Sequence, residues 1–210
     1  MTQSPTAAAG DFTVWLGEIG RAFREGAEMD VPCGTCNACC KSSQFIHVER
    51  DEPALDHIPH DLLFPTPGLP DGPLIMGYDA NGHCPMLKDD ACTIYAHRPR
   101  TCRVYDCRIF AASGVLPDEA TKTAVAERVR QWQFSYANAA DDTAHKAVLA
   151  AAAFLSDPSK NVFNGLQPNA IRDSLIALSI YDTFTKDGAL VEPTVEEVRA
   201  AIERVRPQNR

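Results

Sequence analysis

Cysteine placement constrains this chain more than any other sequence feature, because all eight cysteines lie between residues 33 and 107. The first group is the tight run CGTCNACC, which contains Cys33, Cys36, Cys39 and Cys40. The second group is spread more widely and consists of Cys84, Cys92, Cys102 and Cys107. Eight ionised thiols packed together without a cation would repel one another, so the cluster favours a bound metal.

The expected compartment argues against disulfide bonds. The first residues, MTQSPTAAAG, lack the basic start and the apolar stretch of a secretory signal. The longest apolar run, Ala147 to Leu155, is much shorter than the roughly 20 residues of a membrane-spanning helix. We therefore expect a cytoplasmic protein that does not enter a membrane. Because cytoplasmic thiols are kept reduced, the cluster predicts metal or redox chemistry.

Charge argues against nucleic acid as a partner. The chain carries 20 basic and 28 acidic side chains, which gives a formal net charge of −8. None of its three segments, residues 1–32, 33–107 and 108–210, has a basic excess. A protein that tracks a phosphate backbone needs a basic face, so no nucleic-acid partner is expected.

These three segments also describe the expected domain organisation. Residues 1–32 read as a loose tail followed by a helix over 11–28, with Asp11 as its N-cap and an apolar stripe that includes Phe12 and Trp15. Residues 108–210 show four apolar stripes at helical spacing, which predict four helices in a small bundle. One stripe runs from Val125 to Tyr136, and Thr194 with Glu197 forms a capping box for the last helix.

The cysteine segment, residues 33–107, is expected to be irregular. Its central part is rich in proline, which excludes a long helix and predicts an extended surface loop with one helical turn near 51–57. Two short apolar runs, 74–78 and 83–87, flank an Asn-Gly turn and predict a hairpin. The fold class is therefore mainly α, with a small irregular α+β metal-binding region packed on a helical bundle.

The spacing of the first cysteine group leaves two kinds of centre open. C-x2-C-x2-C is the spacing that holds three corners of a cubane [4Fe–4S] cluster in bacterial ferredoxins. Here Cys40 follows Cys39 at once, so the run departs from the ferredoxin pattern. Zinc also accepts four thiolates, and C-x2-C is a common half of a zinc site. We favour an iron–sulfur cluster and keep zinc as the alternative.

All eight cysteines are candidate ligands. Cys39 and Cys40 are adjacent, and neighbouring side chains point in different directions in both a strand and a helix, so the two rarely bind one ion. The pair therefore leaves the number of metal centres open. The spacings of the second group suit the distal ligands of a discontinuous site. His83 and His97 lie among these cysteines and are weaker candidate ligands.

Four arginines also lie among the later cysteines, at Arg98, Arg100, Arg103 and Arg108. A centre built from several thiolates keeps a negative charge, which an arginine can offset by donating N–H groups to sulfur. Arg103 is the first choice for this role, because it directly follows Cys102.

The order of these motifs resembles the YkgJ-type cysteine-cluster family, also called CxxCxxCC and described as a zinc- or iron-chelating domain. The matching elements are Cys33 to Cys40, Cys84-Pro85-Met86-Leu87, Cys92-Thr93-Ile94-Tyr95, Arg98-Pro99 and Cys102-Arg103. A related cysteine pattern occurs in flagellin lysine methylases, where it is taken to hold an iron–sulfur cluster. The resemblance covers about residues 33–107 and implies metal chelation without implying a reaction.

Three functions follow as hypotheses. The leading one is a metal-binding protein whose cysteines chelate an iron–sulfur cluster or zinc. The second is a metal- or cluster-dependent oxidoreductase or protein-modifying enzyme, which needs an open coordination position. The third is a structural zinc module whose helices bind a protein partner.

Overall fold

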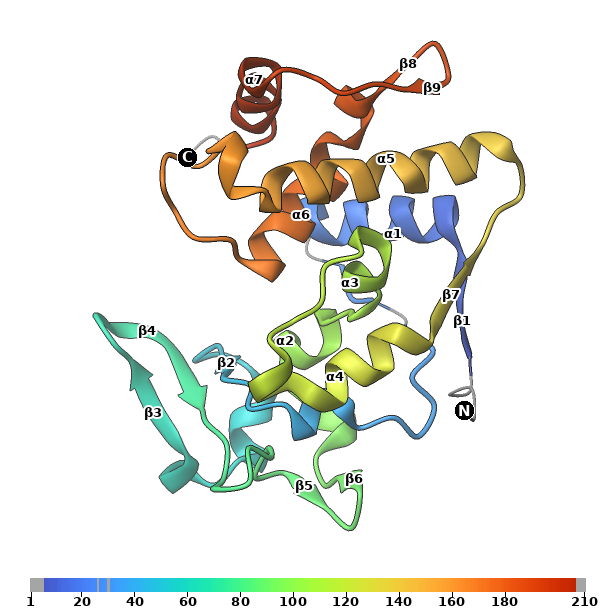
Figure 1. The fold of residues 1–210 in the computed structure, drawn as a ribbon. Helices are drawn as coiled ribbons and strands as arrows, with labels where there is room; N and C mark the ends of the chain where they lie inside the picture. Colours follow the sequence, from blue (N-terminus) through green and yellow to red (C-terminus); the bar gives the residue numbers. More distant parts are fainter. Residues whose placement is uncertain (1–5, 26, 30, 207–210) are drawn as a thin grey trace. The chain divides into compact units, whose positions relative to one another are not determined.

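The computed structural model describes residues 6–25, 27–29 and 31–206, and the chain divides into two compact units (Figure 1). The helical unit comprises Met1–Arg24, Cys107–Pro117 and Val129–Arg210. The cysteine unit comprises Glu25–Asp106 and Asp118–Arg128. The described residues form seven α-helices and several short strands, which confirms the mainly α class. The packing of the helices as a bundle stays a prediction.

The N-terminal part of the helical unit is more ordered than the sequence predicts. Ala7–Asp11 forms strand β1, which pairs in parallel with strand β7, Trp132–Ser135 (Figure 1). The expected loose tail is therefore wrong for residues 7–10, and residues 1–5 lie outside the described residues. Helix α1 follows at Phe12–Glu25, and Asp11 Oδ1 accepts the backbone N–H groups of Thr13 and Val14, both at 3.1 Å. The predicted helix and its N-cap are confirmed.

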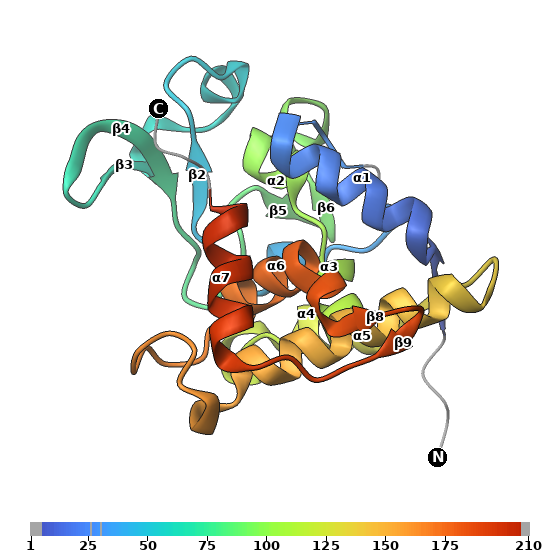
Figure 2. The same cartoon turned by 90° about the horizontal axis from the view of Figure 1, so that it is seen from above.

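Four further helices build the rest of the helical unit: α3 (Arg108–Ser113), α5 (Ala139–Ser156), α6 (Ala170–Ile180) and α7 (Val195–Val205). Helix α5 packs against α3 and α6, and α6 packs against α7, which Figure 2 shows from above. The capping box predicted at Thr194 and Glu197 is present. Within the described part of the chain, no helix is both long and apolar enough to cross a membrane.

One predicted stripe changes secondary structure partway along. Helix α4 occupies Glu119–Gln131, and the chain then continues as β7. The prediction of one helical face from Val125 to Tyr136 is therefore wrong beyond Gln131. The segment from Trp132 to Ser135 is rich in aromatic residues, which fit a pleated strand well, and β1 supplies its hydrogen-bonding partner.

In the cysteine unit, the proline-rich region forms strands where a surface loop is expected. Strand β4 (Leu69–Met76) lies between β2 (Ile46–Val48) and β3 (Leu63–Thr66), and both pairings are antiparallel (Figure 1). The expected helical turn is present as a 3₁₀ helix at Pro53–His57. The expected hairpin between 74–78 and 83–87 is wrong, because Leu74–Met76 pairs with β2 and β3 instead.

The cysteine unit has a small apolar core. Its buried members are Val48, Ala54, Ile58, Met76, Met86 and Ile94. Cys84 and Cys92 are partly buried and pack against this cluster. The core therefore holds two of the cysteines in place.

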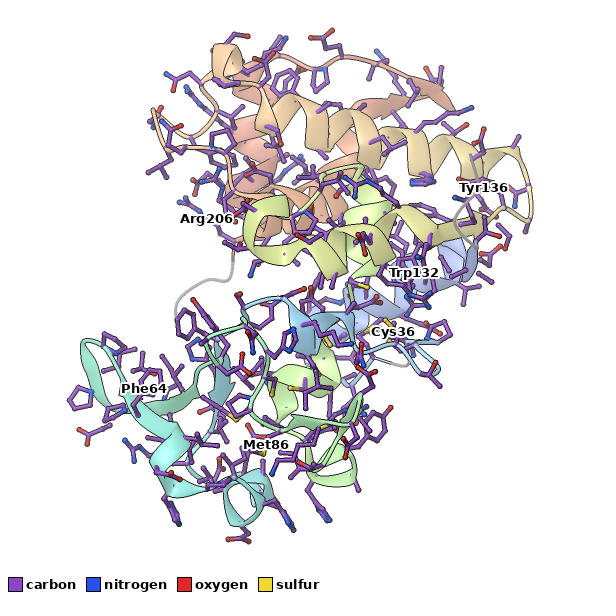
Figure 3. The ribbon with its side chains drawn as sticks, turned by 60° about the horizontal axis from the view of Figure 1, so that its bottom comes forward. Cys36, Phe64, Met86, Trp132, Tyr136 and Arg206 are labelled. Atoms are coloured by element: carbon purple, nitrogen blue, oxygen red, sulfur yellow. The ribbon has the colours of Figure 1, made fainter. Side chains whose placement is uncertain are left out.

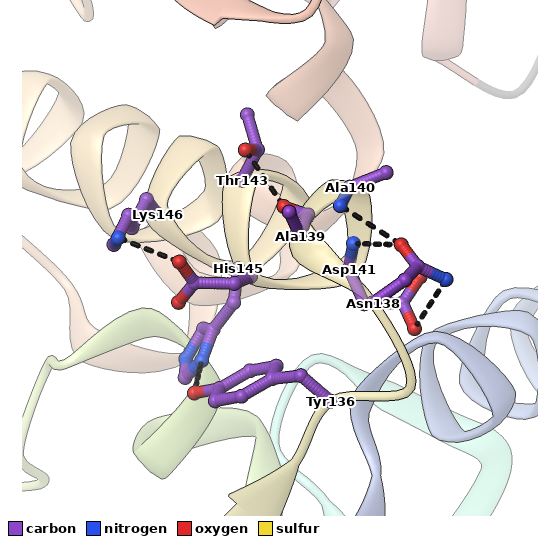
Figure 4. A network of polar contacts seen from close by, with 9 residues as sticks. Tyr136, Asn138, Ala139, Ala140, Asp141, Thr143, His145 and Lys146 are labelled. Atoms are coloured by element: carbon purple, nitrogen blue, oxygen red, sulfur yellow. Dashed lines mark hydrogen bonds and ion pairs between the residues drawn. The ribbon is translucent and has the colours of Figure 1, made fainter.

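In the helical unit, His145 lies in an aromatic cluster near the start of α5. Its ring stacks on Phe12, with centroids 4.4 Å apart, and its Nδ1 lies 2.7 Å from Tyr136 Oη (Figure 4). Burial lowers the pKa of His145 below its usual value near 6.5, and backbone hydrogen bonding at Ala112 and Ala111 opposes this shift. The neutral imidazole is therefore the form that the folded helical unit favours.

We expect the helical unit to lose stability as the pH falls through the ordinary histidine pKa. Unfolded His145 then takes up a proton that the folded protein binds more weakly, and one proton limits the slope to about 1.4 kcal/mol per pH unit. Denaturant titrations of wild type and His145→Gln between about pH 7.5 and about pH 5.5 test this expectation. The variant should show a smaller slope, and equal slopes would contradict the assignment.

Candidate metal centre

Two tight turns shape the first cysteine group. The backbone N–H of Cys36 donates to the carbonyl of Cys33 at 3.0 Å, and that of Cys40 donates to Asn37 at 2.9 Å. The second turn continues as a 3₁₀ helix at Ala38–Lys41. This 3₁₀ helix contains Cys39 and Cys40, whereas Cys33 and Cys36 lie before it. The thiol of Cys40 forms a hydrogen bond with that of Cys39.

The second group comes from three short elements that follow one another along the chain. Cys84 precedes the hairpin of β5 (Leu87–Lys88) and β6 (Ala91–Cys92), in which Cys92 pairs with Leu87. Asp89 and Asp90 form its turn with positive φ angles of 49° and 59°. Cys102 lies on the short helix α2, Arg100–Val104. Figure 3 shows the side chains of this unit as sticks, with sulfur in yellow and Cys36 and Met86 labelled.

Two backbone hydrogen bonds join these groups although they are far apart in sequence. The N–H of Cys84 donates to the carbonyl of Cys40 at 2.7 Å, and the N–H of Ser43 donates to Gly82 at 2.8 Å. Gly82 has a φ of 77°, and a Cβ there would collide with Ser43 Oγ. Glycine is therefore needed at this crossing, which sets Cys84 beside Cys40.

Polar side chains make a second connection between the groups. Asn37 Nδ2 donates to the backbone carbonyl of Asp90 at 2.9 Å, and Lys41 Nζ donates to Asp90 Oδ1 at 2.5 Å. The bond from Lys41 lowers the pKa of Asp90, so this carboxylate stays ionised. The turn of the β5–β6 hairpin is thereby held against the first cysteine loop.

Ser42 anchors the end of that loop within the cysteine unit. Its side chain is fully buried, and Oγ donates to the carbonyl of Ala38 at 2.8 Å. The same oxygen accepts the N–H of Val125 in α4 at 3.2 Å, and Lys122 Nζ donates to the Ser42 carbonyl at 3.4 Å. Helix α4 therefore holds the end of the first cysteine loop through these hydrogen bonds.

Cys39 and Cys40 are electrostatically unlike each other. A hydrogen bond from the Cys40 thiol lowers the pKa of Cys39 to about 7. The same hydrogen bond, together with burial, raises the pKa of Cys40. Cys39 is therefore the thiol of the pair that ionises near neutral pH, and thiolate is the form that binds metals.

Burial disfavours the ionised form of three further thiols, those of Cys33, Cys84 and Cys102. Burial raises the pKa of Cys33 to about 11 and of Cys102 to about 12, and it also raises the pKa of Cys84. Neighbouring thiols add to each of these shifts. The charge of Cys39 contributes to all three shifts.

The chemistry of these donors fits iron or zinc. Seven cysteines belong to the cysteine unit, none of them forms a disulfide, and soft thiolates are the preferred ligands of zinc and of iron–sulfur clusters. Across residues 6–25, 27–29 and 31–206, no three His, Cys, Asp or Glu side chains already stand in the arrangement of a metal site. The structure brings the seven thiols into one unit without setting them at ligand positions.

Cys107 stands apart from the other seven cysteines, because it belongs to the helical unit. Its side chain is buried, and Trp132 Nε1 donates to its sulfur at 3.2 Å. Its predicted role as a metal ligand stays a prediction.

Among the four arginines predicted to offset the charge of the centre, Arg98 is the one whose charge acts on the thiols. The charge of Arg98 lowers the pKa values of Cys39 and Cys102. Arg103 instead forms an ion pair with Glu28 at 2.6 Å and donates to the backbone carbonyl of Arg98. Arg108 belongs to the helical unit, where it donates to the carbonyl of Ala9 at 3.0 Å. His97, a weaker candidate ligand, stacks on His57 with ring centroids 3.8 Å apart.

Sequence reasoning missed the residues that join the two cysteine groups. Asn37, Lys41 and Asp90 look like ordinary surface residues in the sequence, and Ser42 looks like a loop residue. Their contacts span about 50 to 80 residues, as the separations of 53, 49 and 83 positions show. No local pattern encodes contacts over such distances, so only comparison across many homologues could signal them.

Comparisons with known proteins address the same segment. Residues 32–128 match the family model CxxCxxCC, described as "Putative zinc- or iron-chelating domain". No curated protein and no solved structure gives a match. The matched residues include all eight cysteines and Arg98, and they end at the last residue of the cysteine unit, Arg128. Residues 32–128 therefore match the CxxCxxCC family, whose domain is described as zinc- or iron-chelating.

Proposed function

We propose that the cysteine unit chelates an iron–sulfur cluster through its thiolates, with zinc as the alternative occupant. The observation that carries this proposal is the bond from the Cys84 N–H to the Cys40 carbonyl, which joins the two cysteine groups. The contact of Asn37 and Lys41 with Asp90 supports the same arrangement. A chelating site assembled from two distant groups needs such connections, because ligands on separate loops otherwise diverge.

The proposed ligands come from the seven cysteines of the cysteine unit. We assign Cys39 the central position in the proposed site, because its charge raises the pKa values of Cys33, Cys40, Cys84 and Cys102. Cys92 acts on Cys84 and on Cys102, and these three with Cys39 supply four thiols. Cys33, Cys36 and Cys40 leave sulfur for a second centre or a larger one.

Two features support iron–sulfur over zinc. The run from Cys33 to Cys39 has the C-x2-C-x2-C spacing that curls around a cubane cluster. Seven thiols in one unit also exceed the four that one tetrahedral zinc ion takes. When bound, such a group would supply a redox-active or structural centre, and the chain's own residues would hold and orient it.

Metal binding should also contribute to folding of the cysteine unit. The main buried apolar cluster described there is small, and much of the unit is short strand and 3₁₀ helix. The thiols are buried on folding and must ionise to bind metal, so metal affinity is coupled to folding. The bound centre is therefore expected to order the segments that carry the ligands.

Removal of the metal tests this coupling. We expect hydrogen-exchange protection to fall in the cysteine unit after chelation, most of all around Cys33–Lys41 and the β5–β6 hairpin. Protection of helices α5, α6 and α7 in the helical unit should change much less. Equal loss of protection in both units would contradict the proposal, and so would unchanged protection everywhere. Protein treated with metal-saturated chelator is the matched control.

A further inference from the structure

Arg98 lies between the last two elements that carry the cysteine ligands. It follows the 3₁₀ helix Tyr95–His97 and precedes α2, which contains Cys102. Its guanidinium stands over the ring of Tyr95, with Cζ 4.0 Å from the ring centroid. Arg103 donates to the carbonyl of Arg98 and is itself paired with Glu28. Both the side chain and the backbone of Arg98 are therefore held in place.

One atom of this well-held side chain lacks a partner. Arg98 Nε is shielded from solvent and has no hydrogen-bond acceptor among the described residues. A buried N–H of a charged group without an acceptor is costly, so such atoms are rare in folded proteins. An unfilled donor beside a proposed ligand site indicates an acceptor that arrives with the ligand.

The charge around Arg98 identifies the kind of acceptor. Arg98 directly precedes Pro99, whose carbonyl accepts the backbone N–H of Cys102 at 2.9 Å, so Arg98 is held near this cysteine. Its charge also acts on the thiols of Cys39 and Cys102, which belong to different cysteine groups. When these thiols ionise to bind a metal, four thiolates outweigh the charge of a zinc ion and leave the centre anionic. Sulfur of a metal-bound thiolate is then an acceptor suited to a guanidinium N–H.

We propose that Arg98 is a positioning residue of the metal centre, whose Nε–H donates to a metal-bound thiolate and whose charge offsets that of the centre. This inference rests on the proposed function of the cysteine unit. Tyr95 holds the plane of the guanidinium, and Arg103 fixes its backbone. Arginine is required because lysine has neither the planar donor nor the flat face that stacks on tyrosine.

The test measures metal affinity of the full-length chain with Co²⁺ as the probe, because its sulfur-to-metal absorption bands report thiolate binding directly. Affinity is measured by competition with a chromophoric chelator. Arg98→Gln should lower Co²⁺ affinity by about 10- to 100-fold, the usual effect of losing a partner of the ligands. Its sulfur-to-cobalt band should also move to longer wavelength, because a thiolate without a donated hydrogen bond loses its electron more easily. Arg98→Lys should recover only part of the affinity.

Arg50→Gln is the matched control. Arg50 belongs to the same unit, and its substitution removes the same charge. Its side chain donates to the carbonyls of Gly72 and Pro70 on β4. The Co²⁺ affinity and the spectrum of Arg50→Gln should equal those of wild type. Tyr95→Leu should weaken binding in wild type and have no further effect in Arg98→Gln. Because Tyr95→Leu and Arg98→Gln test the same contact independently, the test remains decisive if one of these two variants folds poorly.

The outcomes separate the two claims. If wild type shows no sulfur-to-cobalt band, the proposed function fails. If wild type binds Co²⁺ and Arg98→Gln matches it in affinity and spectrum, the proposed function stands and the role of Arg98 is wrong. Full recovery of both readouts by Arg98→Lys would show that charge alone matters and would overturn the proposed N–H donation.

Discussion

Replacing Cys39 with serine is expected to abolish metal binding by the cysteine unit, with a loss of more than about 100-fold in affinity, since even outer partners of ligands cost 10- to 100-fold. Cys39 occupies the central position among the thiols and is the one whose pKa falls to about 7. Serine keeps the size of the side chain but does not ionise at neutral pH. The measurement is bound metal per chain after purification without oxygen.

Cys107→Ser is the comparison for this variant. Cys107 belongs to the helical unit and accepts a hydrogen bond from Trp132, so the proposal expects Cys107→Ser to keep its metal. Loss of metal in Cys107→Ser would instead place Cys107 among the ligands, as the sequence alone predicts. Full metal content in Cys39→Ser would contradict the central position of that thiol.

Truncating Phe12 to alanine is expected to destabilise the helical unit by about 3–5 kcal/mol, the usual cost of deleting a buried aromatic side chain. Phe12 is fully buried at the start of α1. Its ring stacks on His145 and meets Phe134 edge to face, with centroids 5.3 Å apart. The variant would leave a cavity between α1, β7 and α5. Denaturant unfolding followed by tryptophan fluorescence measures the effect, because both tryptophans, Trp15 and Trp132, lie in this unit.

Val14→Ala on the same helix is the control for Phe12→Ala. Val14 is 61% exposed, so its truncation should change the free energy of unfolding by no more than about 0.5 kcal/mol. A loss of similar size in both variants would show that α1 does not pack through Phe12.

Local signals in the sequence were reliable where short-range chemistry decides the structure. Asp11 caps α1, and Thr194 with Glu197 caps α7, because both caps depend on residues only two or three positions apart. The spacing of the first cysteine group likewise predicts a tight loop, and the structure shows successive turns there. The family match then supports the chelating chemistry read from the motifs.

Non-local contacts explain where the sequence misled. Leu74–Met76 carries a good hairpin pattern, yet β2 and β3 offer it longer pairing than the nearby 83–87 segment does. Trp132–Ser135 continues a helical stripe, yet β1 from the far N-terminus converts it to a strand. Arg103 follows Cys102 directly, yet it pairs with Glu28, and the charge of Arg98 acts on the Cys102 thiol instead. Each of these three differences from the prediction depends on a contact with a residue that lies far away in the sequence.

The most direct test of the account is the composition of the protein as purified without oxygen. Iron, acid-labile sulfide and zinc are measured per chain, together with the visible spectrum. We expect iron and sulfide in matching amounts and a broad visible absorption that chelation or oxygen removes. A colourless protein with stoichiometric zinc would contradict the iron–sulfur proposal and leave the chelating role in place. Protein that holds neither iron nor zinc, and takes up neither on reconstitution, would contradict the proposal that the cysteine unit chelates metal.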